Sequence, residues 1–277
     1  MLSILRKIVE KSIYDRILKF VDTNSIITPY QFGFRQGRST SDAISLLIEH
    51  IYGAFNKKQS TIAIFLDFKK AFETIDHKIL IDKLNLYGIR GLPLDLFRSY
   101  VSNRLQCVRV GNKISSPRTV NCGIPQGSCL GPLLFLLYIN DLVNVSDNVS
   151  SLLFADDTTM YASATNINYL TNSVSMDLIK VKSWCDANRL SLNINKTFCM
   201  FFSLVEQISP RIEMTNDEIV YSNETCFLGV TVDKALNFSS HIAGVCLKLA
   251  KTMGIFHRLK YYVPKSILIQ LYYTLIY

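Results

Sequence analysis

The sequence predicts an α+β fold, in which helices accompany a sheet that carries several acidic residues. Residues 61–68 form a near-continuous apolar run of the kind found in buried strands. Residues 151–161 place Asp156 and Asp157 between two short runs rich in apolar and β-branched residues, which is typical of a β-hairpin with the acids at or beside its turn. Segments with apolar residues at helical spacing precede, separate and follow these strands.

The composition is that of a folded basic protein. Hydrophobic residues make up 49% of the 277 residues, which permits a substantial core and argues against disorder. The formal net charge of +8 suggests a polyanionic partner, either nucleic acid or an acidic membrane surface. Seven widely spaced cysteines without a CxxC pair predict reduced thiols in an intracellular protein and argue against a zinc site. The longest apolar run, Leu133 to Ile139, is too short to span a bilayer, so a soluble protein with no membrane-spanning segment is expected.

The first elements are two helices joined by a basic loop. Residues 2–22 have apolar positions at helical spacing and charged residues on the other face, so they predict an amphipathic helix. A second helix is expected over about 41–55. The loop between them, at 33–40, contains Arg35 and Arg38, which are candidate phosphate contacts because guanidinium pairs bidentately with phosphate. The alternative is a solvated basic loop.

The middle of the chain alternates helices with short strands. The buried strand ends at Asp67, and a helix is predicted to follow it as far as about Tyr87. Glycine and proline residues end that helix. The segments predicted next are a helix over 94–101, a hairpin over 104–120, a glycine-bearing loop at 123–128 and a deeply packed helix over about 130–142.

The last third of the chain is predicted to mix strands and helices. An amphipathic helix is expected over 167–188. The alternation in 190–197 and in 197–203 indicates a strand pair, and 226–233 reads as one strand with a glycine inside it. After Phe238 the pattern becomes helical and basic.

Three carboxylates form the candidate catalytic group. Asp67 ends a strand, and Asp156 and Asp157 lie on a hairpin 89 residues later, yet strands this far apart can lie side by side in one sheet. Oxygen-only ligands at one sheet edge suit Mg²⁺, and two such ions about 4 Å apart can activate a hydroxyl and stabilise a departing phosphate oxygen. This site in a basic protein fits phosphoryl transfer on a nucleotide. The alternative is that Asp-Asp is an ordinary turn signal.

Several short segments, in the same order along the chain, resemble the motifs of reverse transcriptases. The similarity is nearest to non-LTR retrotransposons of the jockey-like (LINE-type) kind, and it covers about residues 25 to 240. The segments that carry it are Gly-Phe-Arg-Gln-Gly-Arg-Ser-Thr at 33–40, Phe-Leu-Asp-Phe-Lys-Lys-Ala-Phe at 65–72, Gly-Ile-Pro-Gln-Gly-Ser at 123–128, Phe-Ala-Asp-Asp at 154–157, Leu-Ser-Leu-Asn-Ile-Asn-Lys-Thr at 190–197 and Phe-Leu-Gly-Val at 227–230.

The resemblance implies a right-hand polymerase fold with fingers, palm and a partial helical thumb. Compared with the family, the chain is expected to be truncated at both ends. The domains that it implies are partial fingers at 1–60, a palm with the catalytic hairpin at 61–76 and 120–235, a fingers insertion at 77–119 and the start of a thumb at 236–277.

The resemblance also implies an RNA-directed DNA polymerase that transfers dNMP to a primer 3′-OH. Its expected partners are an RNA template, a DNA primer and dNTPs. Two Mg²⁺ ions, with Mn²⁺ as the alternative, are expected on Asp67 and Asp156, with support from Asp157 and with the backbone carbonyl of Phe68 as a further ligand.

Four further residues receive roles from the same resemblance. Phe72, five positions after Asp67, corresponds to the aromatic residue that leaves no room for a ribose 2′-hydroxyl and so selects deoxynucleotides. Gln126 and Gly127 are expected to lie against the incoming nucleotide and the template base. Lys196 is the candidate acid that protonates the leaving pyrophosphate, although an exposed lysine on a turn is commonly just solvated.

The alternative function is a catalytically inactive retrotransposon fragment that only binds nucleic acid by electrostatic attraction. Losing part of the fingers and thumb is expected to weaken the grip on nucleotide and duplex, even with the three acids in place. The sequence pattern leaves the oligomeric state and the choice between nucleus and cytoplasm open.

Overall fold

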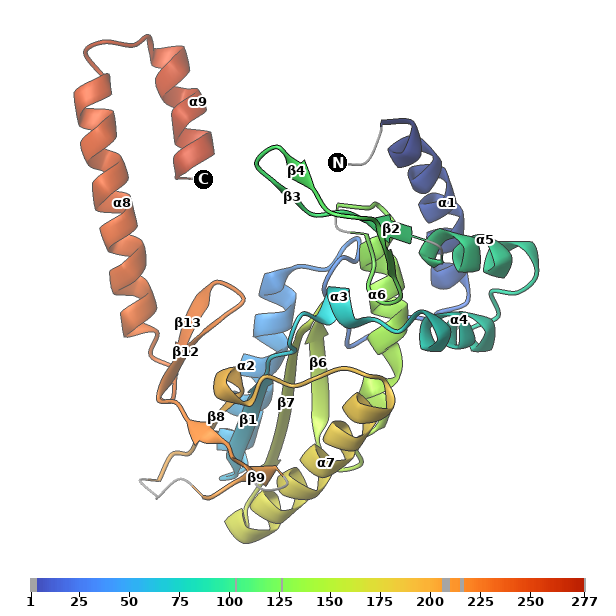
Figure 1. Ribbon diagram of the computed structural model, residues 1–277. Coiled ribbons are helices and arrows are strands. Elements are labelled where there is room, and N and C mark those ends of the chain that lie inside the picture. The colour runs from blue at the N-terminus through green and yellow to red at the C-terminus, as the bar shows by residue number, and fades with distance from the viewer. Residues whose placement is uncertain (1–3, 103, 126, 206–209, 215–216, 277) are drawn as a thin grey trace. The chain divides into compact units, whose positions relative to one another are not determined.

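The computed structural model divides into two compact units, Met1–Tyr221 and Ser222–Tyr277 (Figure 1). None of the helices within the described ranges combines the length and the apolar character needed to span a bilayer. The residues that the structure describes are 4–102, 104–125, 127–205, 210–214 and 217–276.

The first unit is built on a five-stranded sheet with the strand order β11-β8-β1-β7-β6. The central strand β1 pairs antiparallel with β7 on one side and with β8 on the other, and β6 and β7 form an antiparallel hairpin. The predicted buried strand and the predicted acidic hairpin are therefore confirmed. The strands are β1 (Ser60–Leu66), β6 (Ser150–Phe154), β7 (Asp157–Ala164), β8 (Phe198–Phe202) and β11 (Val220–Tyr221).

Helices cover both faces of this sheet, which explains why every residue of β1 is buried. On one face, α6 (Gly131–Ile139) and α7 (Ile167–Ala187) share a large core with Ile62, Ile64 and Leu66. Against the other face packs α2 (Thr40–Asn56), which contacts β1, β6 and β7. Figure 1 shows α7 and α2 on opposite sides of the strands. A strand enclosed in this way reads as a continuous apolar run rather than as an alternating one.

The helix predicted to run to Tyr87 is divided in two in the structure. A short helix α3 (Ala71–Thr74) is followed by α4 (His77–Leu86). Asp76 has an extended backbone, and its Oδ1 accepts a hydrogen bond from the Ile79 N–H at 3.0 Å. An aspartate N-cap starts a new helix because its side chain satisfies a backbone donor of the first turn. The N-terminal helix α1 (Ile4–Thr23) and helix α5 (Leu92–Val101) agree with the predictions.

The hairpin predicted over 104–120 is an exposed ribbon. In its lower part β2 (Arg104–Gln106) pairs with β5 (Arg118–Val120), and in its outer part β3 (Arg109–Val110) pairs with β4 (Lys113–Ile114). These strands pair with each other and not with the central sheet. The ribbon therefore presents most of its side chains to solvent.

The strand pair predicted over 190–203 is wrong in its first half. The structure has a 3-10 turn, η2 (Ile194–Lys196), before β8, and the N–H groups of Lys196 and Thr197 both donate to the Asn193 carbonyl. A turn that closes on Asn193 ends any strand there, and β8 pairs with β1 instead. The remaining short elements of this unit are η1 (Asn140–Asn144), β9 (Glu213–Met214) and β10 (Asp217–Glu218).

The second unit contains a hairpin and two helices. The single strand predicted over 226–233 is instead β12 (Glu224–Phe227) and β13 (Val230–Asp233), joined by a two-residue turn. Leu228 and Gly229 both have positive φ, +48° and +89°, as the tightest hairpin turns require. The predicted basic helical region is confirmed as α8 (Ser239–Leu259) and α9 (Lys265–Leu275).

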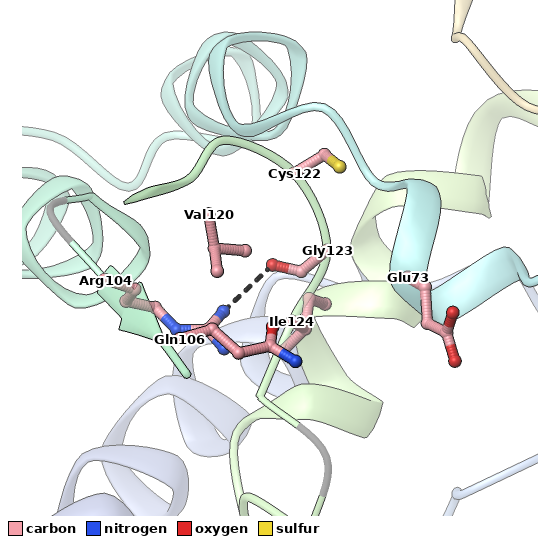
Figure 2. Close-up of a pocket in the computed structure, with 7 residues that line it drawn as sticks. All are labelled: Glu73, Arg104, Gln106, Val120, Cys122, Gly123 and Ile124. Carbon is pink, nitrogen blue, oxygen red and sulfur yellow. Dashed lines mark hydrogen bonds between the residues drawn. The ribbon is translucent and has the colours of Figure 1, made fainter. Parts of the chain in front are cut away.

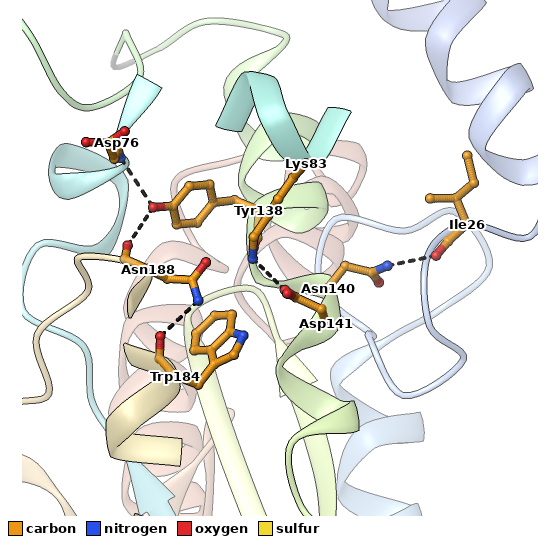
Figure 3. Close-up of polar contacts among 8 residues, drawn as sticks. All are labelled: Ile26, Asp76, Lys83, Tyr138, Asn140, Asp141, Trp184 and Asn188. Atoms are coloured by element: carbon orange, nitrogen blue, oxygen red, sulfur yellow. Dashed lines mark hydrogen bonds and ion pairs between the residues drawn. The ribbon is translucent and has the colours of Figure 1, made fainter. Parts of the chain in front are cut away.

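A buried polar cluster ties α4, α6 and the end of α7 together (Figure 3). The Tyr138 hydroxyl donates to the Asn188 carbonyl at 2.5 Å and accepts from the Asp76 N–H at 3.4 Å. Lys83 Nζ donates to Asp141 Oδ1 at 2.5 Å and to the Tyr138 carbonyl at 2.7 Å. Burial lowers the pKa of Lys83, while the hydrogen bond to Asp141 acts in the opposite direction. The cluster therefore holds α4, α6 and the C-terminal end of α7 against one another.

A second buried contact anchors the chain just before β6. Asp177 on α7 is fully buried, and its Oδ2 accepts the N–H groups of Asn148 at 2.8 Å and Val149 at 3.1 Å. Lys180 Nζ lies 3.0 Å from the other carboxylate oxygen. This carboxylate therefore sets where the acidic hairpin begins.

We expect Asp177→Ala to lower the free energy of unfolding by about 2 kcal/mol, because two backbone donors lose their acceptor in a buried position. The matched control is Asp186→Ala on the same helix, whose carboxylate is 61% exposed and pairs with Lys182. An exposed pair contributes roughly 0–1 kcal/mol. Urea unfolding of both variants measures the difference, and equal losses would contradict the anchoring role of Asp177.

Candidate active site

The register between β1 and β7 places two of the predicted acids opposite each other. The last pair of this ladder is Leu66 with Thr158. Asp67 directly follows Leu66, and Asp157 directly precedes Thr158, so they occupy the next position on each strand. Facing residues of an antiparallel pair lie about 4.5–5.5 Å apart at their Cα atoms.

The third acid lies on the turn that joins β6 to β7. These strands pair as far as Phe154 with Asp157, which leaves Ala155 and Asp156 as a two-residue turn. Ala155 has a φ of +55°, the left-handed conformation that such tight turns use. The structure thus brings Asp67, Asp156 and Asp157 to the same end of the sheet.

The electrostatics of this sheet end are unfavourable in the absence of a cation. Loss of hydration, followed by the negative charges of Asp156 and Asp67, raises the pKa of Asp157. Asp157 is exposed overall, so water screens part of this repulsion. The direction of the shift still shows that the charges of Asp67 and Asp156 act on Asp157.

Asp67 is oriented by a residue to which the sequence analysis gave no role. Asn193 Nδ2 donates to Asp67 Oδ2 at 2.9 Å, and the Asn193 N–H donates to the Asp67 carbonyl at 2.7 Å. The Asp67 N–H donates to Thr197 Oγ1 at 3.4 Å. Lys196, the candidate acid, is exposed in the same turn. The one available signal was that this turn belongs to the motif at 190–197.

An isolated β-bridge determines the direction in which the Phe68 carbonyl points. Phe68 and Leu192 form an isolated antiparallel bridge, and its hydrogen bonds are made by the residues on either side of Phe68. In a pair of this kind the residue's own N–H and C=O face the other way. The Phe68 carbonyl therefore faces the side of the chain on which Asp156 and Asp157 lie.

Phe72 and the glycine-bearing loop line one pocket. The Phe72 ring stacks on Phe135, with centroids 4.4 Å apart, and meets the edge of Phe34 at 6.4 Å. The structure brings Phe72 and Gly127 together, whereas Gln126 lies outside the described residues. The pocket has a volume of about 260 Å³ and is lined by Phe72, Ile124, Pro125, Gly127, Ser128, Gly131 and Pro132.

Close backbone contacts hold this loop against α3. The Ile124 N–H donates to the Phe72 carbonyl at 3.0 Å, and the Gly123 N–H donates to the Ile75 carbonyl at 2.8 Å. Gly123 has a φ of +78°, and a Cβ at this position would lie 2.5 Å from the Glu73 carbonyl oxygen. Only glycine permits this approach.

A larger polar pocket adjoins the Phe72 pocket and shares Ile124 with it (Figure 2). It lies at the base of the exposed ribbon, where Arg104 Nη1 donates to the Gly123 carbonyl at 3.2 Å. The same loop thus forms a wall of both pockets. This second pocket has a volume of about 530 Å³ and is lined by Glu73, Arg104, Gln106, Val120, Cys122, Gly123 and Ile124.

The two arginines of the loop at 33–40 have different surroundings. Arg35 is half-buried, and its Nη1 donates to the Thr28 carbonyl at 3.0 Å. Arg38 is exposed, with its guanidinium 5.2 Å from the centre of the Phe32 ring. Phe34, between them, is the residue of this loop that meets Phe72.

Gln31, a residue without a predicted role, contacts the turn of the acidic hairpin. Its side chain is 1% exposed, and its Oε1 accepts the N–H groups of Ala155 at 3.0 Å and Gly33 at 2.9 Å. No local pattern signals this contact, because the two segments are more than a hundred residues apart.

The carboxylate and carbonyl oxygens at this end of the sheet are of the kind that binds a hard divalent cation. Carboxylate and carbonyl oxygens are the ligands that such ions prefer, and loss of hydration, followed by the charges of Asp156 and Asp67, raises the pKa of Asp157. Across the described part of the chain, no group of three or more His, Cys, Asp or Glu side chains is already arranged to hold a metal ion.

Comparisons with known proteins identify the family. A family model described as "Reverse transcriptase (RNA-dependent DNA polymerase)" matches residues 1–232. The probable RNA-directed DNA polymerase from transposon BS of Drosophila melanogaster is 32% identical over 257 residues, which are 87% of this chain and 28% of that protein. The RNA-directed DNA polymerase from the mobile element jockey of the same species is 28% identical over 251 residues, 87% of this chain and 27% of that protein. The chain thus spans little more than a quarter of the length of these relatives.

Solved structures support the fold. An apo telomerase from Candida tropicalis, truncated from its C-terminal domain, superposes with a TM-score of 0.56 at 12% identity and covers 83% of this chain and 44% of that one. A telomerase from Candida albicans, in complex with a fragment of telomeric RNA, has a TM-score of 0.55 at 10% identity and covers 97% of this chain and 49% of that one. The expected polymerase fold is confirmed, and with a family model that matches most of its length, the chain belongs to the reverse transcriptase (RNA-dependent DNA polymerase) family.

Proposed function

We propose that this chain is the catalytic core of an RNA-directed DNA polymerase of a mobile element. It adds deoxynucleotides to the 3′-OH of a DNA primer on an RNA template. The observation that carries the proposal is the register of β1 against β7, which sets Asp67 opposite Asp157 with Asp156 on the adjoining turn. Acids from two distant segments meet where loss of hydration and their own charges raise the pKa of Asp157, and such a perturbed cluster is typical of a functional site.

Asp67, Asp156 and Asp157 would hold the divalent metal ions that reverse transcriptases generally use, together with the Phe68 carbonyl. We propose two Mg²⁺ ions, with Mn²⁺ able to replace them. Bound there, such ions supply Lewis-acid activation of the primer hydroxyl and stabilise the departing phosphate oxygen.

Residues of the chain itself position the reacting groups. Asn193 fixes the Asp67 carboxylate through its side-chain amide. Phe72, with its ring held by Phe135, forms the wall against the sugar of the incoming nucleotide, and Gly127 lies on the same pocket. Because the ring is packed on one face, it cannot swing aside for a 2′-hydroxyl. Lys196 is the proposed proton donor to pyrophosphate.

The charge distribution suits a nucleic-acid duplex. Between Asp95 and Asp141 the sequence has no acidic residue, and the exposed ribbon lies in this stretch. Cationic side chains that neutralise backbone phosphates give affinity for nucleic acid without sequence preference. Arg35 and Arg38 are proposed as additional phosphate contacts. The cations of the acid-free stretch are Arg98, Arg104, Arg109, Lys113 and Arg118.

We propose that the polymerase subdomains follow the family pattern, with partial fingers at 1–60 and the fingers insertion at 77–119. The palm would comprise 61–76 and 120–235. The helical pair that begins near 236 would be the start of the thumb, and it falls within the compact unit Ser222–Tyr277.

The direct test is primer extension on an RNA template with dNTPs and Mg²⁺. We expect wild type to extend the primer, and we expect Asp156→Asn to lower the rate by at least about 10³-fold, or roughly 4 kcal/mol of barrier, because a metal-binding carboxylate is lost.

The matched control is Asp186→Asn, which removes an exposed carboxylate on α7 and should leave extension unchanged. A folded wild type that binds RNA–DNA duplex but never extends it would support an inactive fragment instead. Equal activity of wild type and Asp156→Asn would show that the extension comes from a contaminating enzyme.

A second test concerns the sugar. We expect Phe72→Val to lower the preference for dNTPs over rNTPs, measured as a ratio of kcat/KM values, by about tenfold or more, because the smaller side chain opens space for the 2′-hydroxyl.

Its control is Phe55→Val on α2, a half-buried aromatic residue that meets the edge of Tyr52 and lines neither described pocket. Single-nucleotide incorporation with both nucleotide types measures the ratio. An unchanged ratio in Phe72→Val would refute the assigned role of the ring.

A further inference from the structure

We propose that Gln31 is a positioning residue for the turn that carries Asp156. The inference rests on the proposed function, in which this turn presents a metal-binding carboxylate. Gln31 touches neither substrate nor ion in this account. It acts through the backbone of Ala155, and it couples the loop before α2 to the catalytic hairpin.

The segment around Gln31 runs along the free edge of β6. Gln31 forms a parallel bridge with Leu153. The Leu153 N–H donates to the Tyr30 carbonyl at 2.9 Å, and the Phe32 N–H donates to the Leu153 carbonyl at 2.8 Å. These two bonds place the Gln31 side chain next to the turn, one residue beyond the end of β6.

The side-chain oxygen of Gln31 then satisfies two backbone donors. Both partners, the N–H groups of Ala155 and Gly33, are donors, so the amide group must face them with its oxygen. Ala155 is the first residue of a two-residue turn, and the strand ladder offers its N–H no partner. Because Ala155 is buried, that donor would be unsatisfied without Gln31.

Close packing adds to this contact. A Cβ on Gly33 would lie 2.3 Å from the Ala155 nitrogen, so the backbones of the two segments meet directly. Ala155 is held in the left-handed conformation, in which an alanine is strained. The loop segment therefore supports the turn from one side and limits the positions that Asp156 can take.

The acidic residues nearby explain why position 31 carries an amide side chain rather than a carboxylate. Glutamate would offer the same acceptor, but it would add a buried negative charge next to the turn that carries Asp156 and Asp157. Glutamine accepts both hydrogen bonds without charge. Its Nε2 is buried with no partner among the described residues, an energetic cost that is tolerated.

The first experiment needs no variant. Hydrogen exchange of the Ala155 amide, measured by NMR on the wild-type chain, reports the contact directly. We expect slow exchange, comparable to that of the amides of β7, because the N–H is buried and bonded. Exchange at the rate of an unstructured turn would overturn the proposal, whether or not the protein extends primers.

The second experiment compares two isosteric variants. Gln31→Met removes the acceptor and keeps the length of the side chain. Asn140→Leu removes a similar buried carboxamide, which binds the Ile26 carbonyl and the Thr28 N–H of the same loop at 2.8 Å each but does not contact the turn.

Both variants should lose thermal stability to a similar extent. We expect only Gln31→Met to lower kcat, by about tenfold or more, with the KM for dNTP and the Kd for RNA–DNA duplex changed by less than about twofold, because a small displacement at the reacting group affects the chemical step. Only Gln31→Met should speed exchange of the Ala155 amide.

Equal losses of kcat in the two variants would reduce Gln31 to a structural residue and overturn the proposal. Unchanged kcat in a folded Gln31→Met would do the same. If Gln31→Met fails to fold, the rate of hydrogen exchange at the Ala155 amide of the wild type still tests the proposal. A wild type with a protected Ala155 amide and no extension activity would contradict the proposed function while leaving the contact established.

Discussion

The antiparallel pairing of β1 with β7 determines both where the acids lie and how the core packs. It alone determines that Asp67 lies opposite Asp157, which follows it by 90 residues in the chain. A slip of one residue would turn every side chain of β1 to the other face of the sheet. Because helices cover both faces and β1 is buried throughout, such a slip would exchange the apolar side chains packed on the two faces and disrupt the packing of both. The packing of the core thus fixes the geometry of the acids.

That geometry carries an electrostatic cost which the fold limits with neutral groups. Asn193 and Gln31 both use side-chain amides, one to hold the carboxylate of Asp67 and the other to hold the turn before Asp157. Neither adds charge to the acidic end of the sheet. Such an arrangement is less stable than it could be, as is common where function requires like charges to meet.

Local sequence patterns were sufficient for the elements that carry the acids. The apolar run at 61–68 and the acidic hairpin at 151–161 were predicted because burial and turn chemistry act over a few residues. The second helix, expected over about 41–55, was likewise predicted, and in the structure Ser39 forms a capping box at its start. These features depend on neighbours in the chain.

The remaining features depend on contacts between distant segments. The segment 190–197 alternates like a strand but closes into a turn, because Asn193 bonds Asp67. The segment 226–233 was predicted as one strand with a glycine inside it, but it folds into a hairpin in which Leu228 adopts the left-handed conformation that leucine rarely takes. The role of Gln31 depends on its partner Ala155, far along the chain, and no local rule indicates it.

The charges of Asp67, Asp156 and Asp157 repel one another until a cation binds, and the thermal stability of Asp157→Asn tests this repulsion. The raised pKa of Asp157 means that the ionised carboxylate costs stability above that pKa, and that the cost disappears as the pH falls towards the unfolded value of 3.8.

The decisive measurement is the Tm of wild type and Asp157→Asn from pH 7 down to pH 4, with and without Mn²⁺. Our account predicts a higher Tm for the variant at pH 7 without metal, a difference that shrinks as the pH falls, and a larger rise with Mn²⁺ in wild type than in the variant. Equal Tm values at pH 7 and no effect of Mn²⁺ on either protein would contradict it.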